Sequence, residues 1–592
     1  MTPLHDQDVA TSYEAWIGAL REAGGLEPLA SEVIDIAHAC GRVSAQTVVA
    51  RRSSPAFDAA AMDGIAVAAV ATTAAPLTLA PGAFARVDTG DPLPPGTDAV
   101  VRSEDVVLAA GAALEHEVAP YSNVRQVGED VAAGDLLLQA GRRLGPADLA
   151  VVASAGAATI AVLRRPVVAI LPSGDELVEP GTDLRPGEIV ETNSLMLAAM
   201  VEQGGGVAVR LPIVPDDELL LTEALARAAE GSDLVLLLAG SARGAGDHAV
   251  AVIEQSGQVI VRGVAVKPGH PVVLGLTGTT PVIGVPGYPV SAAIAFELFA
   301  APLLAALGGR PAVQRPRVRA TAPIAIRSTP RSDEWVRVRL VRIGDDLRAL
   351  PLRRGAAVLS SLARADGLVC VPLGSSGIGA GADVEVELLR PLEAIERSLV
   401  VSGSTDPLLD ELAARFELLA DCDGSANGAA SLVAGRCHLA LVAMEDMPPA
   451  AAVLSTWERT LGLVVAPGDP LAIGDVEGLR RREVRLVNRQ QGSASRRLLD
   501  DLLAAGSIDP AAVTGYQREA RSHAAAVAAV AAGVADCAVC SLSACSGQPV
   551  ELIPLATQTL VLAAGGGLVE DARLTGLRAV LGKGSPPAPV LE

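Results

Sequence analysis

Apolar and polar positions along the chain follow different patterns, and each pattern predicts a different kind of element. Near the N-terminus, the segments YEAWIGALREAGG and SEVIDIAHACGRV show helical spacing, and glycine closes each of them. From 51 to 142 the apolar runs are short and interrupted by proline and glycine, which predicts a β-rich module. The segment GPADLAVVASAG then predicts a short helix with Pro146 near its first turn.

Strands and helices alternate between 166 and 310. RPVVAILPSGDEL is an apolar strand followed by a polar turn, and SDLVLLLAGSARGAGDHAVAVIEQSG and PVIGVPGYPVSAAIAFELFAAPLLAAL each continue from a strand through a glycine turn into a helix. Alternation of this kind predicts a mostly parallel sheet, whose ligands bind at the carboxyl ends of the strands. We therefore expect the chemistry in those turns.

The predicted fold class is an α/β multidomain chain. Segments such as EWVRVRLVRI predict a small β domain, RSLVVSGSTDPLLDELAARF begins a second α/β unit, and the end of the chain is rich in proline and glycine. In chain order we expect a helical N-terminal linker region at 1–50 and 143–165, an inserted β-rich domain at 51–142, a central α/β domain at 166–310, a small β domain at 311–395, a second α/β domain at 396–570 and a flexible tail at 571–592.

Charge and composition narrow the possible partners. The chain has 592 residues, too many for one core, and a formal net charge of −21, which argues against nucleic acid as a partner. It contains no uninterrupted apolar run of about 18 residues and no basic segment followed by an apolar core at its start. We therefore expect a soluble, cytoplasmic protein with no membrane segment.

The cysteines predict neither a disulfide framework nor a zinc site. There are seven, scattered along the chain, and Cys537, Cys540 and Cys545 lie close together in CAVCSLSAC. A structural zinc site needs four ligands, and no second C-x-x-C or histidine pair accompanies this one. We favour buried small apolar side chains over a metal site.

Lysine is almost absent from the chain. Of the 47 basic residues only Lys267 and Lys583 are lysines, and Lys267 lies in VKPGHP. A solvated surface lysine is one interpretation. Because arginine serves nearly everywhere else, the alternative is a site that needs a compact ammonium for phosphate or a molybdate-like anion.

Four turns contain residues that could carry chemistry. TGDPLPPGTDAVVRSEDV holds Thr89 among carboxylates, AMDG holds Asp63, PSGDEL places two carboxylates after a buried strand, and AGSARGAGDH offers glycine-loop amides. Carboxylates after a strand could hold Mg²⁺, and glycine-loop amides ahead of a helix can bind oxyanions. For each turn alone, ordinary turn chemistry is the competing interpretation.

Taken together, these turns resemble a known family. AMDGIAV, TGDPLPPGTDAVVRSEDV, NVRQVGEDVAAGD, PSGDEL, GEIVETNSLML, AGSARGAGDH, VKPGHPVVLG and GVPGYPVSA occur in the order found in the molybdopterin molybdenumtransferase family, which includes MoeA-type proteins and the corresponding domain of gephyrin. The resemblance covers about residues 10 to 390. It implies an elongated four-part subunit in a homodimer, with a cleft between the α/β part of one subunit and the β-rich part of the other.

The resemblance also implies site residues. Carried over by motif, the catalytic residues would be Asp63, Thr89, Asp130, Glu176, Asp247 and Lys267. Asp175, Glu176 and Asp247 would hold Mg²⁺. The cofactor, molybdopterin or its adenylylated form, would be bound by Ser173, Gly174, Gly240, Ser241, Gly244, His270, Pro286, Gly287, Pro289 and Ser291. The sequence departs from the family pattern at Ala59, Ala60, Ile65, His270 and Tyr288.

The C-terminal unit resembles the periplasmic-binding-protein-like domain appended to some members and is similar to LysR-type substrate-binding domains. The resemblance is carried by SGSTDPLLDELAARF, DGSANGAASLVAGRCHLALV and VRLVNRQQGSASRRLLDDLL. Such folds bind a small ligand between two lobes, through hydroxyls and helix N-terminal amides. The candidates are Ser402, Ser404, Ser425, Arg489, Gly492, Ser493 and Ser495, and an ordinary helix N-cap is the competing interpretation for each.

The expected function is Mg²⁺-dependent insertion of molybdate into adenylylated molybdopterin with release of AMP, together with binding of a small ligand by the C-terminal domain. The alternative is a catalytically impaired regulator or scaffold that binds molybdate, tungstate or molybdopterin. The resemblance implies a homodimer, with molybdopterin adenylyltransferase and molybdoenzymes as possible partners. Neither nucleic acid nor membrane is expected.

Overall fold

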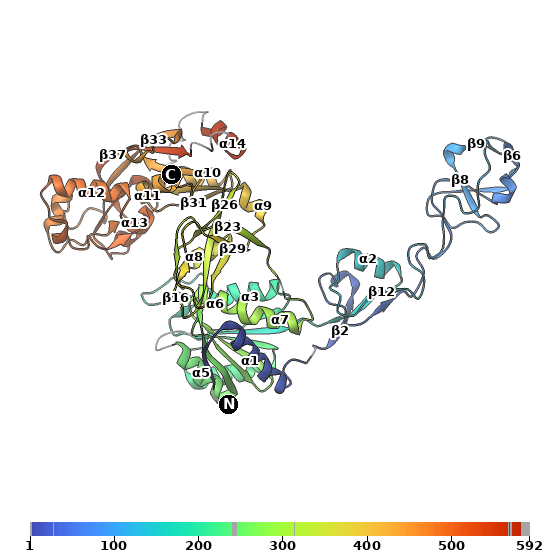
Figure 1. The fold of residues 1–592 in the computed structure, drawn as a ribbon, viewed down its shortest axis with the longest axis horizontal. Helices are drawn as coiled ribbons and strands as arrows, with labels where there is room; N and C mark the ends of the chain where they lie inside the picture. Colours follow the sequence, from blue (N-terminus) through green and yellow to red (C-terminus); the bar gives the residue numbers. More distant parts are fainter. Residues whose placement is uncertain are drawn as a thin grey trace. The chain divides into compact units, whose positions relative to one another are not determined.

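The computed structural model describes residues 3–27, 29–239, 245–312, 314–565, 568 and 571–581 (Figure 1). The chain divides into two compact units. The first comprises Met1–Ala265 and Gly269–Gln314, and the second Val266–Pro268 and Arg315–Glu592. The division passes through the VKPGHP segment, so Lys267 and His270 belong to different units.

A seven-stranded sheet forms the centre of the first unit. Its strand order is β1-β19-β21-β22-β18-β14-β17. The strands β17, β14, β18 and β22 are mutually parallel, whereas β21 is antiparallel to both of its neighbours. The bounds are Leu4–Gln7 for β1, Val167–Pro172 for β14, Val207–Arg210 for β17, Leu234–Ala239 for β18, Gln258–Val264 for β19, Val273–Thr277 for β21 and Thr280–Pro286 for β22. The parallel strands therefore end at one edge of the sheet, as the alternating sequence predicts.

Helices follow the strands and bury their apolar residues against the sheet. Leu221 and Leu225 of α4 and Ile253 of α5 pack with Leu171 and Val235 of the sheet. The helices are α3 (Asn193–Gln203), α4 (Glu218–Glu230), α5 (Ala245–Ser256), α6 (Pro289–Ala295) and α7 (Ala301–Leu307), the last two joined by a π-helical turn, Phe296–Ala300. Helix α1 (Val9–Glu22) is confirmed, and its buried Trp16 donates through Nε1 to the Gly275 carbonyl at 2.8 Å.

One helical stretch of the described chain, 289–307, is long and apolar enough to cross a membrane. Its mean hydropathy is 2.0, and 72% of the most apolar window is buried inside the protein. Phe299 and Leu303 are fully buried there. These properties are also those of a core helix of a globular domain.

The second helix expected near the N-terminus is wrong. Residues Ser31–Asp35 of SEVIDIAHACGRV form strand β2, which pairs antiparallel with β13 (Thr159–Leu163), and only Ile36–His38 are helical, in a 3₁₀ turn. The strand's partner lies more than a hundred residues later, so local spacing could not reveal the pairing. The short helix at Pro146 is confirmed as α2 (Pro146–Ser154).

The β-rich part is built from two small sheets, with strand orders β7-β5-β8 and β6-β10-β9. They share a core that contains Ile65, Val67, Leu79 and Leu114. A third pair joins β4 (Ala59–Ala60) to β11 (Val124–Arg125). The remaining bounds are Gly64–Val67 for β5, Leu77–Leu79 for β6, Phe84–Val87 for β7, Ala99–Arg102 for β8, Val106–Leu108 for β9 and Ala112–Leu114 for β10.

The second unit begins with the small β domain. Its sheet has the order β20-β25-β26-β23-β29-β27, and an additional pairing of β25 with β27 closes it into a barrel around Val338, Leu340 and Val386. The bounds are Val266–Lys267 for β20, Arg317–Thr321 for β23, Asp333–Ile343 for β25, Asp346–Pro351 for β26, Gly367–Val371 for β27 and Asp383–Leu388 for β29.

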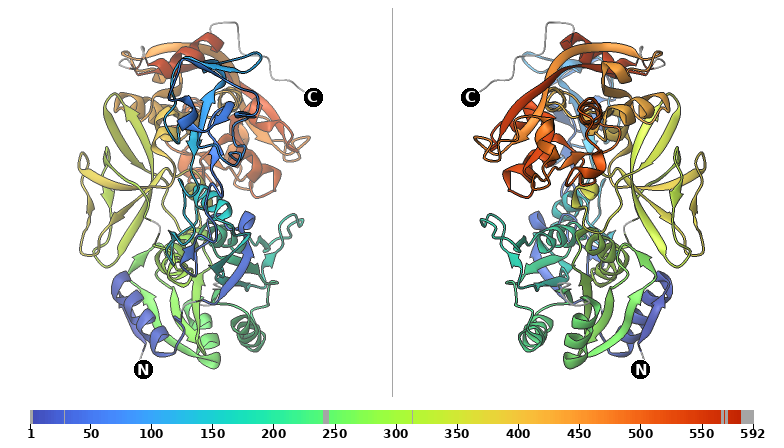
Figure 2. Two further views of the ribbon diagram at one scale, coloured as in Figure 1. Left: turned by 90° about the vertical axis from the view of Figure 1, so that its right-hand side faces the viewer. Right: turned by 90° about the vertical axis from the view of Figure 1, so that its left-hand side faces the viewer.

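The C-terminal domain has two lobes joined by two long strands. β33 (Ala452–Val465) and β37 (Glu551–Ala564), orange to red in Figure 2, pair antiparallel along their whole length within the sheet β31-β30-β32-β37-β33-β36. The first lobe contains β30 (Leu399–Gly403), β31 (Leu418–Asp421), β32 (Leu439–Ala443), α10 (Pro407–Ala413) and α11 (Ser425–Val433). The second lobe contains β34 (Asn488–Arg489), α12 (Ala494–Ala505), β35 (Glu519–Ala520), α13 (His523–Ala531) and β36 (Cys537–Ser541).

Two details of this domain bear on the expectations from sequence. Residues Ala572–Leu581, placed in the flexible tail, form helix α14, whose Leu574 and Leu577 are buried in the core of the first lobe. The proline- and glycine-rich composition begins only after this helix. Cys537 and Cys540 are fully buried on β36, which agrees with their interpretation as small apolar residues.

Candidate functional site

The turn after β14 is held by a residue that the sequence interpretation missed. Ser173, which is 1% exposed, donates through Oγ to Oδ1 of Asp216 at 2.5 Å. The Asp216 N–H donates to Oδ1 of Asp175 at 3.2 Å. Asp216 follows β17, the parallel neighbour of β14. The pair of aspartates in VPDDEL after that strand is the signal that could have identified it.

Three carboxylates therefore lie on neighbouring turns at the carboxyl edge of the sheet. Asp175 is exposed, and Glu176 and Asp216 are half-buried. Among the described residues, no three or more His, Cys, Asp or Glu side chains form a group that could hold a metal ion by themselves. Mg²⁺ usually takes only one or two protein carboxylates and completes its shell with water and phosphate oxygens. The donor set at this edge therefore fits Mg²⁺ as a carrier of phosphate, and does not form a closed protein cage.

The turn after β22 meets the start of α3. Asn193 Nδ2 donates to the Gly287 carbonyl at 2.7 Å, while Asn193 Oδ1 is buried without a partner among the described residues. Pro286 ends β22, Pro289 begins α6, and Ser291 is 3% exposed in its first turn. The turn that holds these predicted residues is therefore hydrogen-bonded to the GEIVETNSLML segment through Asn193. No residue of that segment was predicted to belong to the site.

A buried acid fixes the start of α3. Glu191, 3% exposed, accepts hydrogen bonds from the backbone N–H of Ser194 at 2.8 Å and from its hydroxyl. Arg210 donates through Nε to Ser194 Oγ at 2.8 Å. These contacts hold the α3 N-terminus, and with it Asn193, against the sheet.

Four of the predicted site residues belong to the glycine loop after β18 and the start of α5. Gly240, Ser241 and Gly244, and the side chain of Asp247, lie outside the described residues.

Lys267 and His270 have different surroundings. Lys267 lies on β20, is exposed, and donates through Nζ to Thr329 Oγ1 at 3.0 Å within the second unit. His270 lies in the first unit, with Nε2 3.0 Å from Oδ1 of Asp6. Both groups are accessible to an anion. His270 already has an acidic neighbour.

In the β-rich part, the structure brings two predicted residues together. Thr89 donates to Asp63 Oδ1 from its backbone N–H at 2.7 Å and from its hydroxyl at 2.8 Å. These two bonds, the backbone one first, lower the pKa of Asp63 and keep the carboxylate ionised. Asp130 is held by a different contact, from its N–H to the Ser54 carbonyl at 3.1 Å.

The serines predicted for the C-terminal domain have several roles. Ser493 is the N-cap of α12 and accepts from the Arg496 N–H at 3.1 Å, so the N-cap interpretation holds for this residue. Ser425 accepts from the Ala443 N–H at 2.7 Å and fixes α11 to β32. Ser402 and Ser404 are buried near the end of β30, and Ser495 is 1% exposed with no partner for its hydroxyl among the described residues.

The two lobes touch at the predicted glycine. The Ala426 N–H donates to the Gly492 carbonyl at 3.0 Å. A Cβ at Gly424 would come within 2.8 Å of the same carbonyl oxygen, so glycine is required for this close approach. Arg497 of the second lobe also forms a bidentate ion pair with Asp446 of the first, at 2.6 and 3.0 Å.

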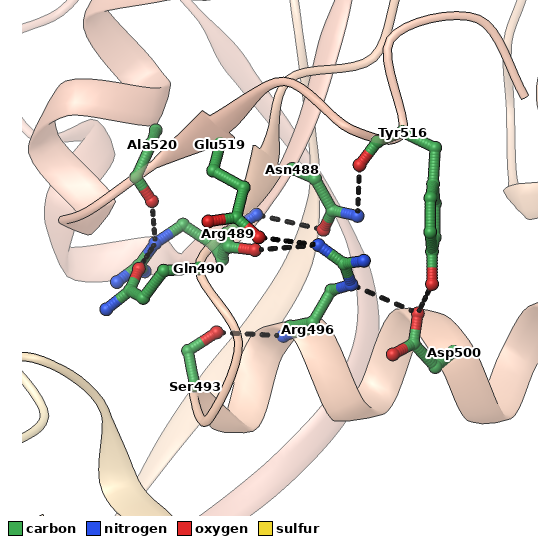
Figure 3. A network of polar contacts seen from close by, with 9 residues as sticks. All are labelled: Asn488, Arg489, Gln490, Ser493, Arg496, Asp500, Tyr516, Glu519 and Ala520. Atoms are coloured by element: carbon green, nitrogen blue, oxygen red, sulfur yellow. Dashed lines mark hydrogen bonds and ion pairs between the residues drawn. The ribbon is translucent and has the colours of Figure 1, made fainter. Parts of the chain in front are cut away.

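Arg496 donates through Nη1 to the Arg489 carbonyl at 3.1 Å, but the two arginine side chains point to opposite sides (Figure 3). Arg496 pairs with Asp500 and Glu519 and stacks on the Tyr516 ring, 4.1 Å from its centroid. The Arg489 side chain lies beside that of Gln490 instead, and its Nε donates to Gln490 Oε1 at 3.3 Å (Figure 3). Sequence interpretation named Arg489 but missed Gln490.

Two more missed residues are close to this part of the second lobe. Arg459 of β33 is 7% exposed and donates through Nε and Nη2 to Gln558 Oε1 of β37. Its Nη1 lies 3.5 Å from Nε2 of the buried His523. An arginine in the middle of a long, largely apolar strand was the available signal.

Family models match almost the whole chain. Residues 11–156 match the MoeA N-terminal region (domains I and II), 169–306 a probable molybdopterin binding domain, and 319–389 the MoeA C-terminal region (domain IV). Residues 408–582 match the PBP superfamily domain, and this range includes helix α14.

Individual relatives agree with these matches. The chain is 33% identical to the molybdopterin molybdenumtransferase of Haemophilus influenzae, over 49% of this chain and 76% of that protein. It is 33% identical to molybdopterin molybdenumtransferase 2 of Mycobacterium tuberculosis, over 60% of this chain and 94% of that protein. The crystal structure of the molybdopterin biosynthesis MoeA protein of Pyrococcus horikoshii superimposes with a TM-score of 0.53 and 28% identity, covering 64% of this chain and 99% of that one. The chain therefore belongs to the molybdopterin molybdenumtransferase family, enzymes of molybdenum cofactor biosynthesis, and carries a PBP-like domain at its C-terminal end.

Proposed function

We propose that the protein inserts molybdate into adenylylated molybdopterin, with Mg²⁺ and with release of AMP. The observation that carries this proposal is the group of carboxylates on the turns after β14 and β17, where the Ser173 to Asp216 bond orients Asp216 beside Asp175. Ligands of open parallel sheets bind at this edge. Family membership supplies the molybdopterin substrate.

The residues divide by charge. One or two of the carboxylates of Asp175, Glu176 and Asp216 would hold Mg²⁺, which supplies positive charge against the phosphate oxygens when bound. Lys267, an exposed ammonium, neutralises the phosphate or the molybdate dianion. Asp63 stays ionised because of its two bonds from Thr89, and can accept a hydrogen bond from substrate.

The bond changes balance without a covalent enzyme intermediate. One molybdate oxygen attacks the adenylyl phosphorus and remains with AMP, while the phosphoanhydride P–O bond breaks and its bridging oxygen stays on the pterin phosphate. The bond between that oxygen and molybdenum breaks, and two dithiolene thiolates bind the metal, so that two Mo–S bonds form as one Mo–O bond is lost. The protein needs only to position the reactants and stabilise charge.

AMP release tests the proposal. Purified protein mixed with adenylylated molybdopterin, Mg²⁺ and molybdate should release one AMP per cofactor formed. If no AMP appears under conditions in which a standard relative turns over, the insertion role is wrong.

The same proposal includes a cytoplasmic homodimer that receives substrate from a molybdopterin adenylyltransferase and passes the cofactor to molybdoenzymes. The family resemblance supports it, because the β-rich part and the α/β part each carry predicted catalytic residues. Sedimentation of the intact protein should give twice the chain mass.

The second candidate is a catalytically impaired binder of molybdate, tungstate or molybdopterin. It is favoured by His270, which replaces the second lysine of the family motif and has Asp6 at 3.0 Å. Under either candidate, we propose that the C-terminal domain binds a small ligand between its lobes. The buried polar residues near Gly492 support this role.

A further inference from the structure

The second lobe of the C-terminal domain contains buried hydrogen-bond donors that lack acceptors. Arg489, 4% exposed, uses Nε to reach the Ala520 carbonyl at 3.1 Å and Gln490 Oε1 at 3.3 Å, and Nη2 to reach the Arg521 carbonyl at 3.4 Å. Its Nη1 has no partner in the described structure, and neither has Nε2 of Gln490. Both atoms can only donate. Donors buried without acceptors are rare in native proteins.

Arg489 also differs from the other buried arginines in its charge balance. No carboxylate of the described chain forms an ion pair with it or offsets its charge. Each of the other four has at least one: Glu334 for Arg337, Asp366 and Asp421 for Arg339, Asp406 for Arg459, and Asp500 and Glu519 for Arg496. An uncompensated buried charge is strongly unfavourable, so a counter-charge from outside the chain would stabilise this one.

Neighbouring groups add to the excess of donors. His523 Nδ1 accepts from the Ser541 N–H at 3.1 Å, which leaves Nε2 as the protonated nitrogen of the neutral ring. That nitrogen faces Arg459 Nη1, another donor, at 3.5 Å. Burial, followed by the charges of Arg489 and Arg459, lowers the pKa of His523 well below its usual value. The ring therefore remains neutral here and donates one hydrogen bond.

We propose that these donors form a binding site for a small oxyanion, held by Arg489 and Gln490 and completed by Arg459 and His523. An oxyanion supplies both requirements of the site, negative charge and several acceptor oxygens, and a guanidinium matches it through paired N–H groups. This inference rests on the proposed ligand-binding role of the C-terminal domain and gives that ligand a chemical class.

The residues of the proposed oxyanion site are connected to both lobes. Arg489 and His523 belong to the second lobe. Arg459 lies on β33, one of the two strands that join the lobes, and its Nη1 also donates to the Thr405 carbonyl of the first lobe at 3.3 Å. An anion bound here would contact the second lobe directly and the first lobe through Arg459.

The test uses the full chain and four oxyanions. Calorimetric titration with sulfate, phosphate, molybdate and tungstate, at constant ionic strength in sodium chloride, should show binding of at least one. Hydrogen exchange of the same sample should then slow in segments 487–496 and 520–525. Wild-type protein whose exchange in these segments is unchanged by all four anions would overturn the inference.

Two variants isolate the charge. R489Q should raise the dissociation constant about 30-fold or more, because loss of one partner from a buried charge pair is costly. R485Q is the matched control: it removes an arginine of the same lobe that is half exposed and paired with Asp536 at 2.7 Å, and it should change the constant less than about 2-fold. Equal affinities of R489Q and wild type would contradict the assignment.

A melting experiment separates anion binding from a structural role. Without added oxyanion, R489Q loses an uncompensated charge but also the hydrogen bonds to the Ala520 and Arg521 carbonyls, so its melting temperature should lie close to that of wild type. With saturating oxyanion, wild type should gain stability and R489Q should not. If saturating oxyanion raised the melting temperature of R489Q as much as that of wild type, Arg489 would have a structural role only and the inference would be overturned.

Hydrogen exchange and AMP release together distinguish a failure of the oxyanion site from a failure of the proposed molybdate insertion. Slower exchange in 171–176 and 264–270 alone, with no change in 487–496, would leave the insertion proposal standing and overturn the oxyanion site. Slower exchange in 487–496 in a protein that releases no AMP would support the oxyanion site and overturn the insertion proposal.

Discussion

The edge of the first unit's sheet and the interior of the C-terminal domain are opposites in charge and exposure. At the sheet edge, Asp175, Glu176 and Asp216 are exposed or half-buried and offer acceptor oxygens. In the second lobe, Arg459 and Arg489 are buried and offer N–H donors. The first arrangement suits a hydrated cation that carries phosphate, and the second a desolvated anion.

The comparison shows how a strongly acidic chain can bind anions. A net charge of −21 repels polyanions at long range, yet salt screens exposed charges over about 10 Å. A few local donors then decide binding. One arginine protected from water by the surrounding lobe can matter more than the overall charge.

The largest effect should follow from removing the ammonium of Lys267, to which we assign the neutralisation of the anionic substrate. K267A should lower the rate of AMP release at least about 100-fold, as loss of one preorganised charge-stabilising donor does in other enzymes. K583A, which removes the only other lysine, is the control and should be fully active. Unchanged turnover in K267A would remove Lys267 from the site.

The C-terminal domain can be weakened without touching that chemistry. L577A deletes a fully buried side chain of α14 and should lower the unfolding free energy of this domain by about 3 kcal/mol. The exposed L219A on α4 should cost much less. AMP release by folded L577A should equal that of wild type, and its loss would show that the C-terminal domain influences the insertion reaction.

A buried histidine makes the C-terminal domain sensitive to acid. Burial lowers the pKa of His438 to about 4, and its neutral ring accepts from the Val400 N–H and contacts the Arg342 carbonyl, each at 2.9 Å. Between pH 6.5 and about 4 the unfolded chain binds the extra proton, so stability is complete above pH 6.5 and falls as the pH drops through this window.

The loss should reach up to about 3 kcal/mol, measured by urea unfolding at several pH values. H438Q should reduce this dependence and leave the part contributed by His523, whose pKa burial also lowers, whereas H270Q, which changes an exposed histidine of the first unit, should leave it unchanged. An unaltered slope in H438Q would assign the acid sensitivity to another group.

The smallest effect concerns the aspartate that sequence interpretation missed. D216N keeps the size of the side chain but removes its charge, and it should raise the Mg²⁺ concentration for half-maximal AMP release about 10-fold. D217N is a close control, because Asp217 caps α4 through the N–H groups of Leu219 and Leu220 and asparagine caps equally well. Equal Mg²⁺ dependence in both variants would exclude Asp216 from the metal site.

Local sequence was sufficient for features that depend on neighbours in the chain. The alternation of strands and helices predicted the mostly parallel sheet, and proline at the start of a helical run predicted α2. Ordered motifs identified the family and brought attention to Asp63, Thr89 and the turn at Ser173. The signal for each element and for each motif lies within about 20 residues, where periodicity and turn chemistry act, although the family was identified by the order of the motifs along the chain.

Only the tertiary structure decided which distant residues meet. Strand β2, the bond from Ser173 to Asp216, the burial of α14, and the facing donors of Arg459 and His523 all join residues 40 or more positions apart. Such contacts leave no local period, because they depend on how the sheets bring strand ends together. The charge of Arg489 was visible in the sequence, but the lack of a compensating acid became evident only when the residues around it were in place.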